Sequence, residues 1–240
     1  MKKKNIIRDY IEAFAFAIIA ALILRAFVIQ AFRIPTGSMK DTLKIGDFLL
    51  VNKFVYGAKT PDRIILTDVK LPSYRFPSLK KPKRGDIIVF KYPRDEKLDY
   101  IKRCVGLPGD TLEVRDGIVY LNHKPYESIE FDKKDFDPDD SIYINYYKVT
   151  TSFGKKYTIR RYAGISPNSR YFGPVVIPDD CLFMMGDNRD NSADSRVWGM
   201  MPMKNIVGEA MVIYWSWDKN VPLWKVFSKV RWGRIFNVIR

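Results

Sequence analysis

Residues 111–122 read TLEVRDGIVYLN and predict a β-hairpin. TLEV and IVYL are runs with high β propensity, and the Arg115-Asp116-Gly117 step between them favours a tight turn. Similar runs, bounded by Gly, Pro, Asp or Asn, occupy residues 85–93, 100–107, 147–162, 181–187 and 205–215. Because strands follow one another at short intervals without a long helical pattern between them, the sequence predicts a mainly β fold of antiparallel sheets or a small barrel.

The rest of the chain divides around this β core. We expect a basic leader and anchor in residues 1–32, core segments in 33–123 and 174–217, a β-rich cap-like insertion in 124–173 and a basic aromatic tail in 218–240. Within the first core segment, residues 57–83 are rich in Pro and Lys and predict a protruding ribbon or loop. The insertion begins with a run of acids and continues as a second hairpin around Phe153-Gly154-Lys155.

The N-terminal region predicts one transmembrane helix. Lys2, Lys3, Lys4 and Arg8 precede a largely apolar stretch from residue 11 to 32, which is long enough to cross a bilayer. Clustered lysines keep the N-terminus in the cytoplasm and place the remainder outside. A cleavable signal peptide is the main alternative, but no small-x-small cleavage site follows the apolar core. A buried core helix is the other alternative.

Charge is the next constraint. The 240 residues carry 41 Lys and Arg against 27 Asp and Glu, and the tail has no acid after Asp218. Its cations alternate with aromatic residues, a pattern that suits a membrane interface, single-stranded nucleic acid or simple packing against the domain. Because an anchor is predicted at the other end of the chain, we favour lipid and expect no nucleic acid.

Composition also limits the chemistry of a site. The chain has one histidine, His123, in a polar turn where a surface position is the simplest interpretation. DNRDNSADSR lacks the glycine and terminal glutamate of a calcium-binding loop, so we expect no metal and no other cofactor. Cys104 and Cys181 could form a disulfide or remain as free thiols.

A serine and a lysine are the remaining candidates for nucleophile and base. Ser38 lies in the turn-like PTGSM, and Lys102 lies in the strand-like run 100–107. Strand alternation points Lys102 and Arg103 to opposite faces, so one of these two cations must lie against the packed side. A desolvated lysine becomes neutral more easily and could accept the proton of a serine hydroxyl.

Three segments in order, PTGSM, DYIKRCVGLPGD and GDNRDNSADSRVWG, together with KRGDIIVFKYP, resemble the conserved boxes of type I signal peptidases, the bacterial leader peptidases. The resemblance covers about residues 32–217. It implies a membrane-bound serine endopeptidase with a Ser-Lys dyad, which cleaves signal peptides from exported preproteins after small residues at positions −1 and −3.

The resemblance makes Ser38 the nucleophile and Lys102 the general base. The oxyanion is then held by the Ser38 main-chain N–H and the Thr36 hydroxyl. Thr36 stands where this family commonly has serine, so its methyl group restricts the rotamer. Asp41 replaces a usual proline, and Cys104 replaces a small aliphatic residue.

The last box supplies the implied supporting residues. Ser192 is expected to hydrogen-bond the lysine amine and orient it, Asp194 and Arg196 to form an ion pair, and Asp187 and Asn188 to hold the turn. The expected walls of the substrate pocket are Phe32, Ile34, Met39, Leu43, Tyr100 and Ile101.

The expected setting is a monomer in the bacterial inner (plasma) membrane, with the catalytic domain on the outer, periplasmic face, acting on secreted preproteins and touching lipid. A self-cleaving Ser-Lys regulator would need a DNA-binding module before Ser38, and none is expected there. The remaining alternative is a membrane-tethered, non-catalytic binding protein with a basic tail.

Overall fold

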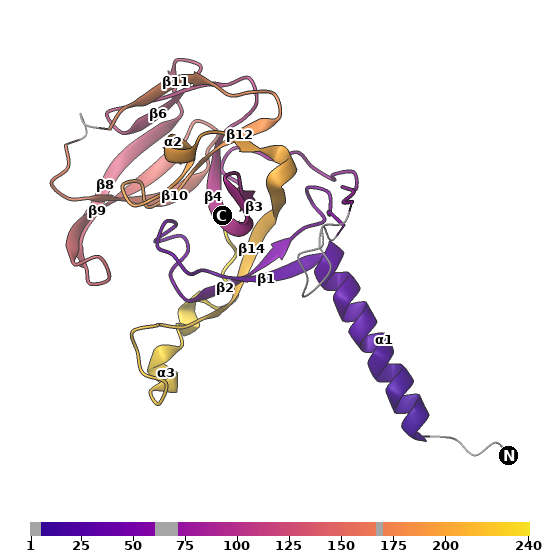
Figure 1. The fold of residues 1–240 in the computed structure, drawn as a ribbon. Helices are drawn as coiled ribbons and strands as arrows, with labels where there is room; N and C mark the ends of the chain where they lie inside the picture. The colour runs from indigo at the N-terminus through magenta and orange to yellow at the C-terminus, as the bar shows by residue number, and fades with distance from the viewer. Residues whose placement is uncertain (1–5, 61–71, 167–169) are drawn as a thin grey trace.

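The computed structural model describes residues 6–60, 72–166 and 170–240. Parts of the predicted leader, ribbon and insertion (1–5, 61–71 and 167–169) lie outside the described residues. The described chain is mostly antiparallel β-sheet behind one long apolar helix (Figure 1). The mainly β prediction is therefore confirmed.

The helix α1 (Ile6–Phe27) projects away from the domain (Figure 1). Its membrane-length window, Ile7–Phe27, has a mean hydropathy of 2.0 and is 0% buried, so the buried core helix is wrong. The helix ends five residues before the predicted end of the anchor, since Ile29–Arg33 form strand β1 and pair with β2 (Asp47–Asn52). Ladder hydrogen bonds to β2 favour this change to strand.

A seven-stranded sheet forms the core in the order β1-β2-β14-β3-β4-β12-β13. Its other strands are β3 (Ile87–Tyr92), β4 (Asp95–Gly106), β12 (Cys181–Met185), β13 (Met201–Pro202) and β14 (Ile206–Ser216). All the pairings are antiparallel. Apolar residues of β2, β3 and β14 pack with Ile34, Met39 and Leu43, and this cluster supports the segment that follows β1.

A four-stranded sheet has the order β11-β5-β6-β7. It comprises β5 (Thr111–Arg115), β6 (Ile118–Leu121), β7 (Lys124–Pro125) and β11 (Phe172–Val176). The predicted hairpin is its β5–β6 pair, in which Leu112 faces Leu121. Asp116 and Gly117 both have positive φ, of 50° and 76°, as the expected tight turn requires.

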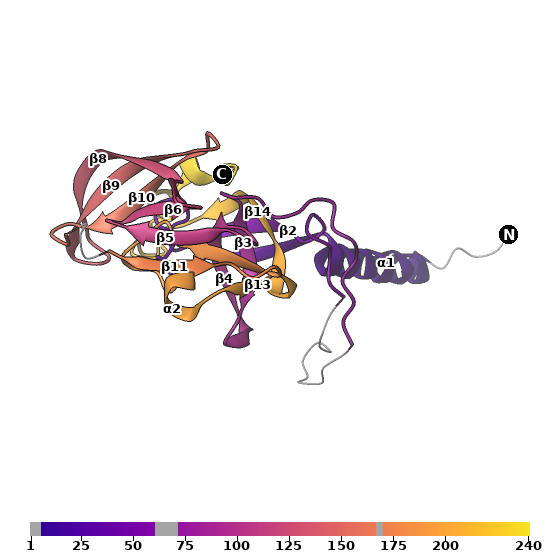
Figure 2. The ribbon, with the colours of Figure 1, turned by 90° about the horizontal axis from the view of Figure 1, so that it is seen from above.

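A three-stranded sheet, β8 (Glu127–Asp137), β9 (Ile142–Thr151) and β10 (Lys156–Tyr162), falls within the predicted insertion. Figure 2 shows it at the end of the domain opposite α1. The predicted turn around Gly154 joins β9 to β10. Tyr157 of β10 covers the Arg103 guanidinium on β4 at 3.9 Å from the ring centre, so the insertion packs directly on the core sheet.

The remaining segments are short. They comprise α2 (Ser195–Trp198), the 3-10 turns Met203–Asn205 and Trp232–Arg234, and α3 (Val226–Lys229). In the described part of 57–83 the only pairing is one bridge, Lys59 with Arg75. Cys104 and Cys181 are free thiols, and the His123 side chain is 80% exposed, as expected for a surface histidine.

Candidate active site

Ser38 lies in a tight turn after β1. The Lys40 N–H donates to the Gly37 carbonyl at 3.0 Å and closes this turn. Asn188 holds it from the opposite loop, since its main-chain N–H donates to the Ser38 carbonyl at 3.1 Å and its Nδ2 donates to the Gly37 carbonyl at 3.0 Å. The turn therefore has a fixed main chain and a half-buried Ser38 side chain.

Lys102 of β4 reaches this serine. Its Nζ lies 2.7 Å from Ser38 Oγ and donates to the Ile101 carbonyl at 2.9 Å, and the side chain is buried. In the described ranges, Lys102 forms no ion pair with a carboxylate. Burial lowers the pKa of Lys102 to about 8, although the charges of Asp194 and Asp187 oppose this fall. The amine is therefore available as a neutral base near physiological pH.

Arg103, the next residue, is also buried, so both cations lie against packed sides, and not just the one that strand alternation requires. The reason is that the insertion sheet covers the second face of β4, as the Tyr157 contact shows. Arg103 Nε and Nη2 donate to the two Asp187 oxygens at 2.9 and 2.7 Å. Asp187 thus neutralises Arg103, and it also accepts a hydrogen bond from Thr42 Oγ1.

Asp194 organises the loop after β12. It accepts the Gly186 N–H at 3.0 Å and caps α2, and its two oxygens receive Arg196 Nε and Nη2 at 2.9 and 2.8 Å. Burial opposes its charge, but the Arg196 guanidinium holds the pKa of Asp194 below its ordinary value. The buried, ionised Asp194 carboxylate therefore holds the two ends of this loop together.

Ser192 does not make the hydrogen bond to Lys102 that the resemblance implies. Its Oγ is buried and, among the described residues, forms no hydrogen bond with Lys102 Nζ; it lies on the Asp194 side, where it helps to lower the pKa of that carboxylate. A Cβ at Gly186 would lie 2.2 Å from this oxygen, so the Ser192 side chain occupies the space that the glycine leaves open. Lys102 Nζ instead has Ser38 and the Ile101 carbonyl as partners.

A cleft of about 430 Å³ opens at Ser38 and Lys102. Four of the expected wall residues line it: Phe32, Ile34, Tyr100 and Ile101. Met39 and Leu43 do not, because they are buried beneath the Ser38 turn in the core cluster. Sequence reasoning missed Leu49 and Val89, whose inward positions on β2 and β3 could have been found from strand alternation. Thr36 is exposed at the cleft.

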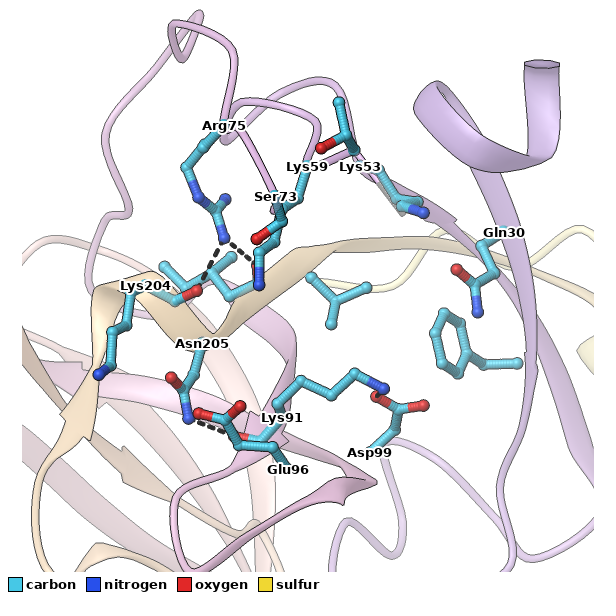
Figure 3. A pocket seen from close by; sticks show the side chains of 14 residues that line it. Gln30, Lys53, Lys59, Ser73, Arg75, Lys91, Glu96, Asp99, Lys204 and Asn205 are labelled. Carbon is cyan, nitrogen blue, oxygen red and sulfur yellow. Dashed lines mark hydrogen bonds and ion pairs between the residues drawn. The ribbon is translucent and has the colours of Figure 1, made fainter. Parts of the chain in front are cut away.

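A second cavity of about 550 Å³ shares Phe32 and Asp99 with this cleft (Figure 3). Its lining is strongly charged, but two of its cations are engaged in structural contacts. Lys91 Nζ lies 3.0 Å from Asp99, and Arg75 donates to the main-chain carbonyls of Lys204 and Ile206. We therefore place the chemistry in the Ser38 cleft. Across the described ranges, no group of His, Cys, Asp and Glu is arranged to hold a metal.

The chain matches known proteins over most of its length. A family model described as "Signal peptidase, peptidase S26" matches residues 7–215. Signal peptidase I of Pseudomonas aeruginosa is 36% identical, over 96% of this chain and 80% of that protein. Signal peptidase I of Rickettsia typhi is 34% identical, over 98% of this chain and 95% of that protein. A solved signal peptidase I from Enterococcus faecalis is 26% identical and aligns with 54% of this chain and 97% of its own, at a TM-score of 0.33 that supports no statement about the fold.

Proposed function

The chain belongs to the signal peptidase family, and on that premise we propose that it cleaves signal peptides from exported preproteins with Ser38 as nucleophile and Lys102 as general base. The observation that carries this proposal is the 2.7 Å separation between Lys102 Nζ and Ser38 Oγ. Burial supports it because it favours the neutral amine, the form that can accept a proton.

The reaction proceeds in two halves. Neutral Lys102 takes the Ser38 proton while Oγ attacks the scissile carbonyl carbon, and the oxyanion is stabilised by the Ser38 N–H and the Thr36 hydroxyl. The C–N bond then breaks, and the leaving amine takes the proton from Lys102. Water hydrolyses the resulting ester, again with Lys102 as base, and Ser38 regains its proton. Each half returns the lysine to the neutral state.

The cleft favours an extended substrate. Phe32 and Ile34 line it from the β1 segment and Ile101 lines it from β4. A signal-peptide segment can lie between these two main chains as an added strand, with alternate side chains directed into the cleft. Because Ile34 is buried and Ile101 partly buried in the apolar core, their side chains cannot move aside easily, which favours small residues at −1 and −3.

The membrane setting follows from the two ends of the chain. We place α1 across the bacterial inner membrane as a single anchor, with the N-terminus cytoplasmic and the domain outside. In Figure 1, α1 and α3 both project from the lower side of the domain. Parts of the tail pack on the domain, since Val230 is buried and the Trp232 ring lies 6.3 Å from the Trp215 ring, but Trp224 and Phe227 are 82% and 84% exposed beside the tail cations. Lipid is the partner that suits them.

A cleavage assay tests this function. The full chain in detergent is incubated with a preprotein, and the new N-terminus of the product is sequenced. We expect one cut after a small residue, and no product with Ser38→Ala. Ser152→Ala is the matched control, because Ser152 is an exposed serine in the β9–β10 turn. An inactive wild type that still binds preprotein would favour the non-catalytic binding protein.

A further inference from the structure

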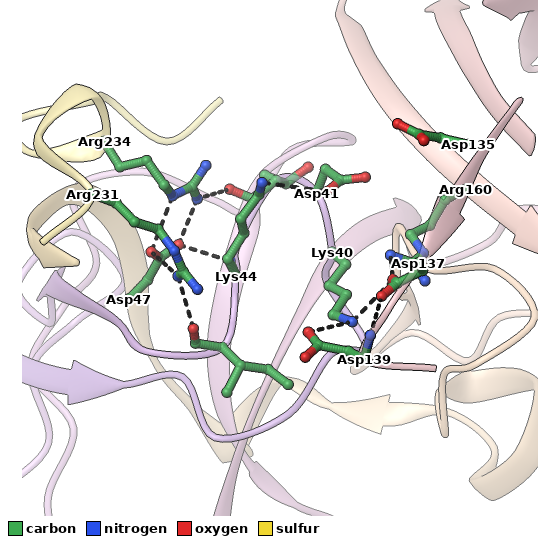
Figure 4. Close-up of polar contacts among 12 residues, drawn as sticks. Lys40, Asp41, Lys44, Asp47, Asp135, Asp137, Asp139, Arg160, Arg231 and Arg234 are labelled. Carbon is green, nitrogen blue, oxygen red and sulfur yellow. Dashed lines mark hydrogen bonds and ion pairs between the residues drawn. The ribbon is translucent and has the colours of Figure 1, made fainter. Parts of the chain in front are cut away.

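Lys40, two residues after Ser38, is a buried cation that links the Ser38 turn to the insertion. Its Nζ lies 3.1 Å from Asp137 Oδ2 and 3.0 Å from Asp139 Oδ2 (Figure 4). Asp140 lies slightly farther away, at 3.7 Å. Asp137 ends β8, and Asp139 and Asp140 lie in the turn from β8 to β9, far from Ser38 in sequence, so Lys40 joins two segments that the chain order does not place together.

The acidic turn is itself held in place. Buried Arg160 of β10 pairs with Asp137 at 2.5 Å and with Asp140 at 2.8 Å. Burial opposes ionisation of Asp137, but Arg160 and Lys40 keep its pKa at about 2. Asn220 Nδ2 adds a hydrogen bond to Asp139 at 2.9 Å. Lys40 therefore binds a preformed anionic turn and not a mobile surface group.

The main chain of Arg160 closes a ring with the loop after β12. Its N–H donates to the Asp187 carbonyl, and its carbonyl accepts the Arg189 N–H, each at 3.0 Å. Asn188, between these two residues, holds the Gly37 and Ser38 carbonyls. The Ser38 turn is thus fixed from two directions by the same strand, through Asn188 on one side and through Lys40 on the other.

We propose that Lys40 is a positioning residue for the proposed reaction: through Asp137 and Asp139, the insertion keeps Ser38 Oγ within reach of Lys102 and the Ser38 N–H directed at the cleft. The inference rests on the proposed roles of Ser38 and Lys102. An exposed ion pair would contribute little, whereas a buried cation that loses its position also shifts the main chain that carries it. Small misplacement of a nucleophile lowers the rate of the chemical step.

The test compares Lys40→Met and Lys40→Arg in the full chain in detergent. We expect Lys40→Met to lower kcat about 10- to 100-fold with KM within about twofold, because the substrate-binding walls stay in place. Lys40→Arg keeps the charge and recovers part of this loss. The control is Lys148→Met, which removes an exposed cation paired with Asp132 at 2.6 Å on the same hairpin and leaves kcat unchanged.

A double-mutant cycle separates positioning from simple stabilisation. Asp139→Asn also lowers kcat, and adding it to Lys40→Met costs less than the product of the two single effects, since both act through one contact. If Lys40→Met does not fold, Asp139→Asn alone carries the test. A wild-type kcat in folded Lys40→Met, or a loss that only tracks the unfolded fraction, overturns the inference. Activity in Ser38→Ala instead overturns the proposed function.

Discussion

Lys102 and Arg103 are neighbours in β4 and both are buried, but among the residues that the structure describes only Arg103 has a carboxylate partner. Burial acts against the charge of both. For Arg103 the Asp187 carboxylate outweighs this effect and raises its pKa, whereas the pKa of Lys102 falls to about 8. Asp187 thus neutralises the charge of Arg103, whereas Lys102 keeps the lowered pKa that its proposed role as a base requires.

The first prediction concerns pH. Lys102 acts only when neutral, so kcat/KM for preprotein cleavage should rise with pH and level off above an apparent pKa of about 8. Lys102→Arg and Lys102→Met should lose about 1000-fold or more, since neither side chain can accept the proton. Lys97→Met, an exposed lysine on the same strand, serves as control. A profile that stays flat down to pH 5 would contradict an amine base.

The second prediction concerns stability. Below pH 8 the Lys102 amine is charged in both the folded and the unfolded protein, so the free-energy cost of burying its charge is fully present. Between pH 8 and 10.5 the unfolded state binds more protons, so wild-type stability rises with pH; above that range the cost is gone. A fall from 10.5 to about 8 corresponds to about 3 kcal/mol.

Lys102→Met should therefore be more stable than the wild type at pH 7. The gain should be at most about 3 kcal/mol, reduced by the contribution of the hydrogen bonds that the lysine amine makes. This advantage should shrink as pH rises to 10.5. The measurement is denaturant unfolding in detergent at several pH values. A constant difference between the two proteins across that range would show that the buried amine is not the cause.

The third prediction concerns Thr36. If its hydroxyl stabilises the oxyanion, Thr36→Val should lower kcat about 100- to 1000-fold with little change in KM. Thr36→Ser keeps the hydroxyl without the restricting methyl group, so its activity should equal or exceed that of the wild type. Steady-state kinetics on one preprotein decide this. Equal activity of the valine and serine variants would remove Thr36 from the mechanism.

The fourth prediction concerns Gly186. A Cβ here would lie 2.2 Å from Ser192 Oγ and 2.5 Å from the Ser38 carbonyl oxygen, so Gly186→Ala must displace both. We expect kcat to fall at least tenfold while the fold persists, because displacement of the Ser38 carbonyl disturbs the nucleophile. Adding Ser192→Ala should restore only part of the lost activity, since it removes Oγ but leaves the clashes with the Ser192 Cβ, at 2.6 Å, and with the Ser38 carbonyl. Gly233→Ala, where nothing lies within 4 Å, should be neutral.

The fifth prediction concerns the tail. In liposomes made with brominated lipids, Trp224 fluorescence should be quenched if the tail enters the interface. Trp224→Phe should remove most of the quenching, whereas Trp198→Phe should not, because Trp198 is buried in the core. Quenching that is unchanged by Trp224→Phe would place residue 224 away from lipid and leave Trp232, which is 57% exposed, as the tail residue in contact with it.

Local sequence predicted the elements well where the cause is local. The hairpin at Asp116 and Gly117 depends on positive φ at two adjacent residues, and the sequence offers residues that tolerate it. The apolar anchor was predicted too, but its end was not, because hydropathy cannot separate a helix from the apolar strand that follows it. Phe32 and Ile34, which line the cleft, were expected there from the resemblance to signal peptidases and not from local pattern.

Contacts across the fold were harder to predict. Alternation along β4 assigns Lys102 and Arg103 to opposite faces, but it does not reveal that the insertion covers the second face. Met39 and Leu43 follow the nucleophile closely in sequence, yet the turn directs them into the core. The link from Lys40 to the β8–β9 acids gave no sequence signal, since it joins segments about a hundred residues apart.

The sequence by itself determined most of the strands, the hairpin turn and the apolar helix, because propensity and hydropathy act over a few residues, and its resemblance to signal peptidases singled out Ser38 and Lys102. Only the tertiary structure decided which cation would be left without a carboxylate. That outcome depends on Asp187 meeting Arg103 across 84 positions and on the Ser38 turn covering the Lys102 amine across 64. Desolvation is set by what packs around a group, and strand order, not local sequence, sets that packing.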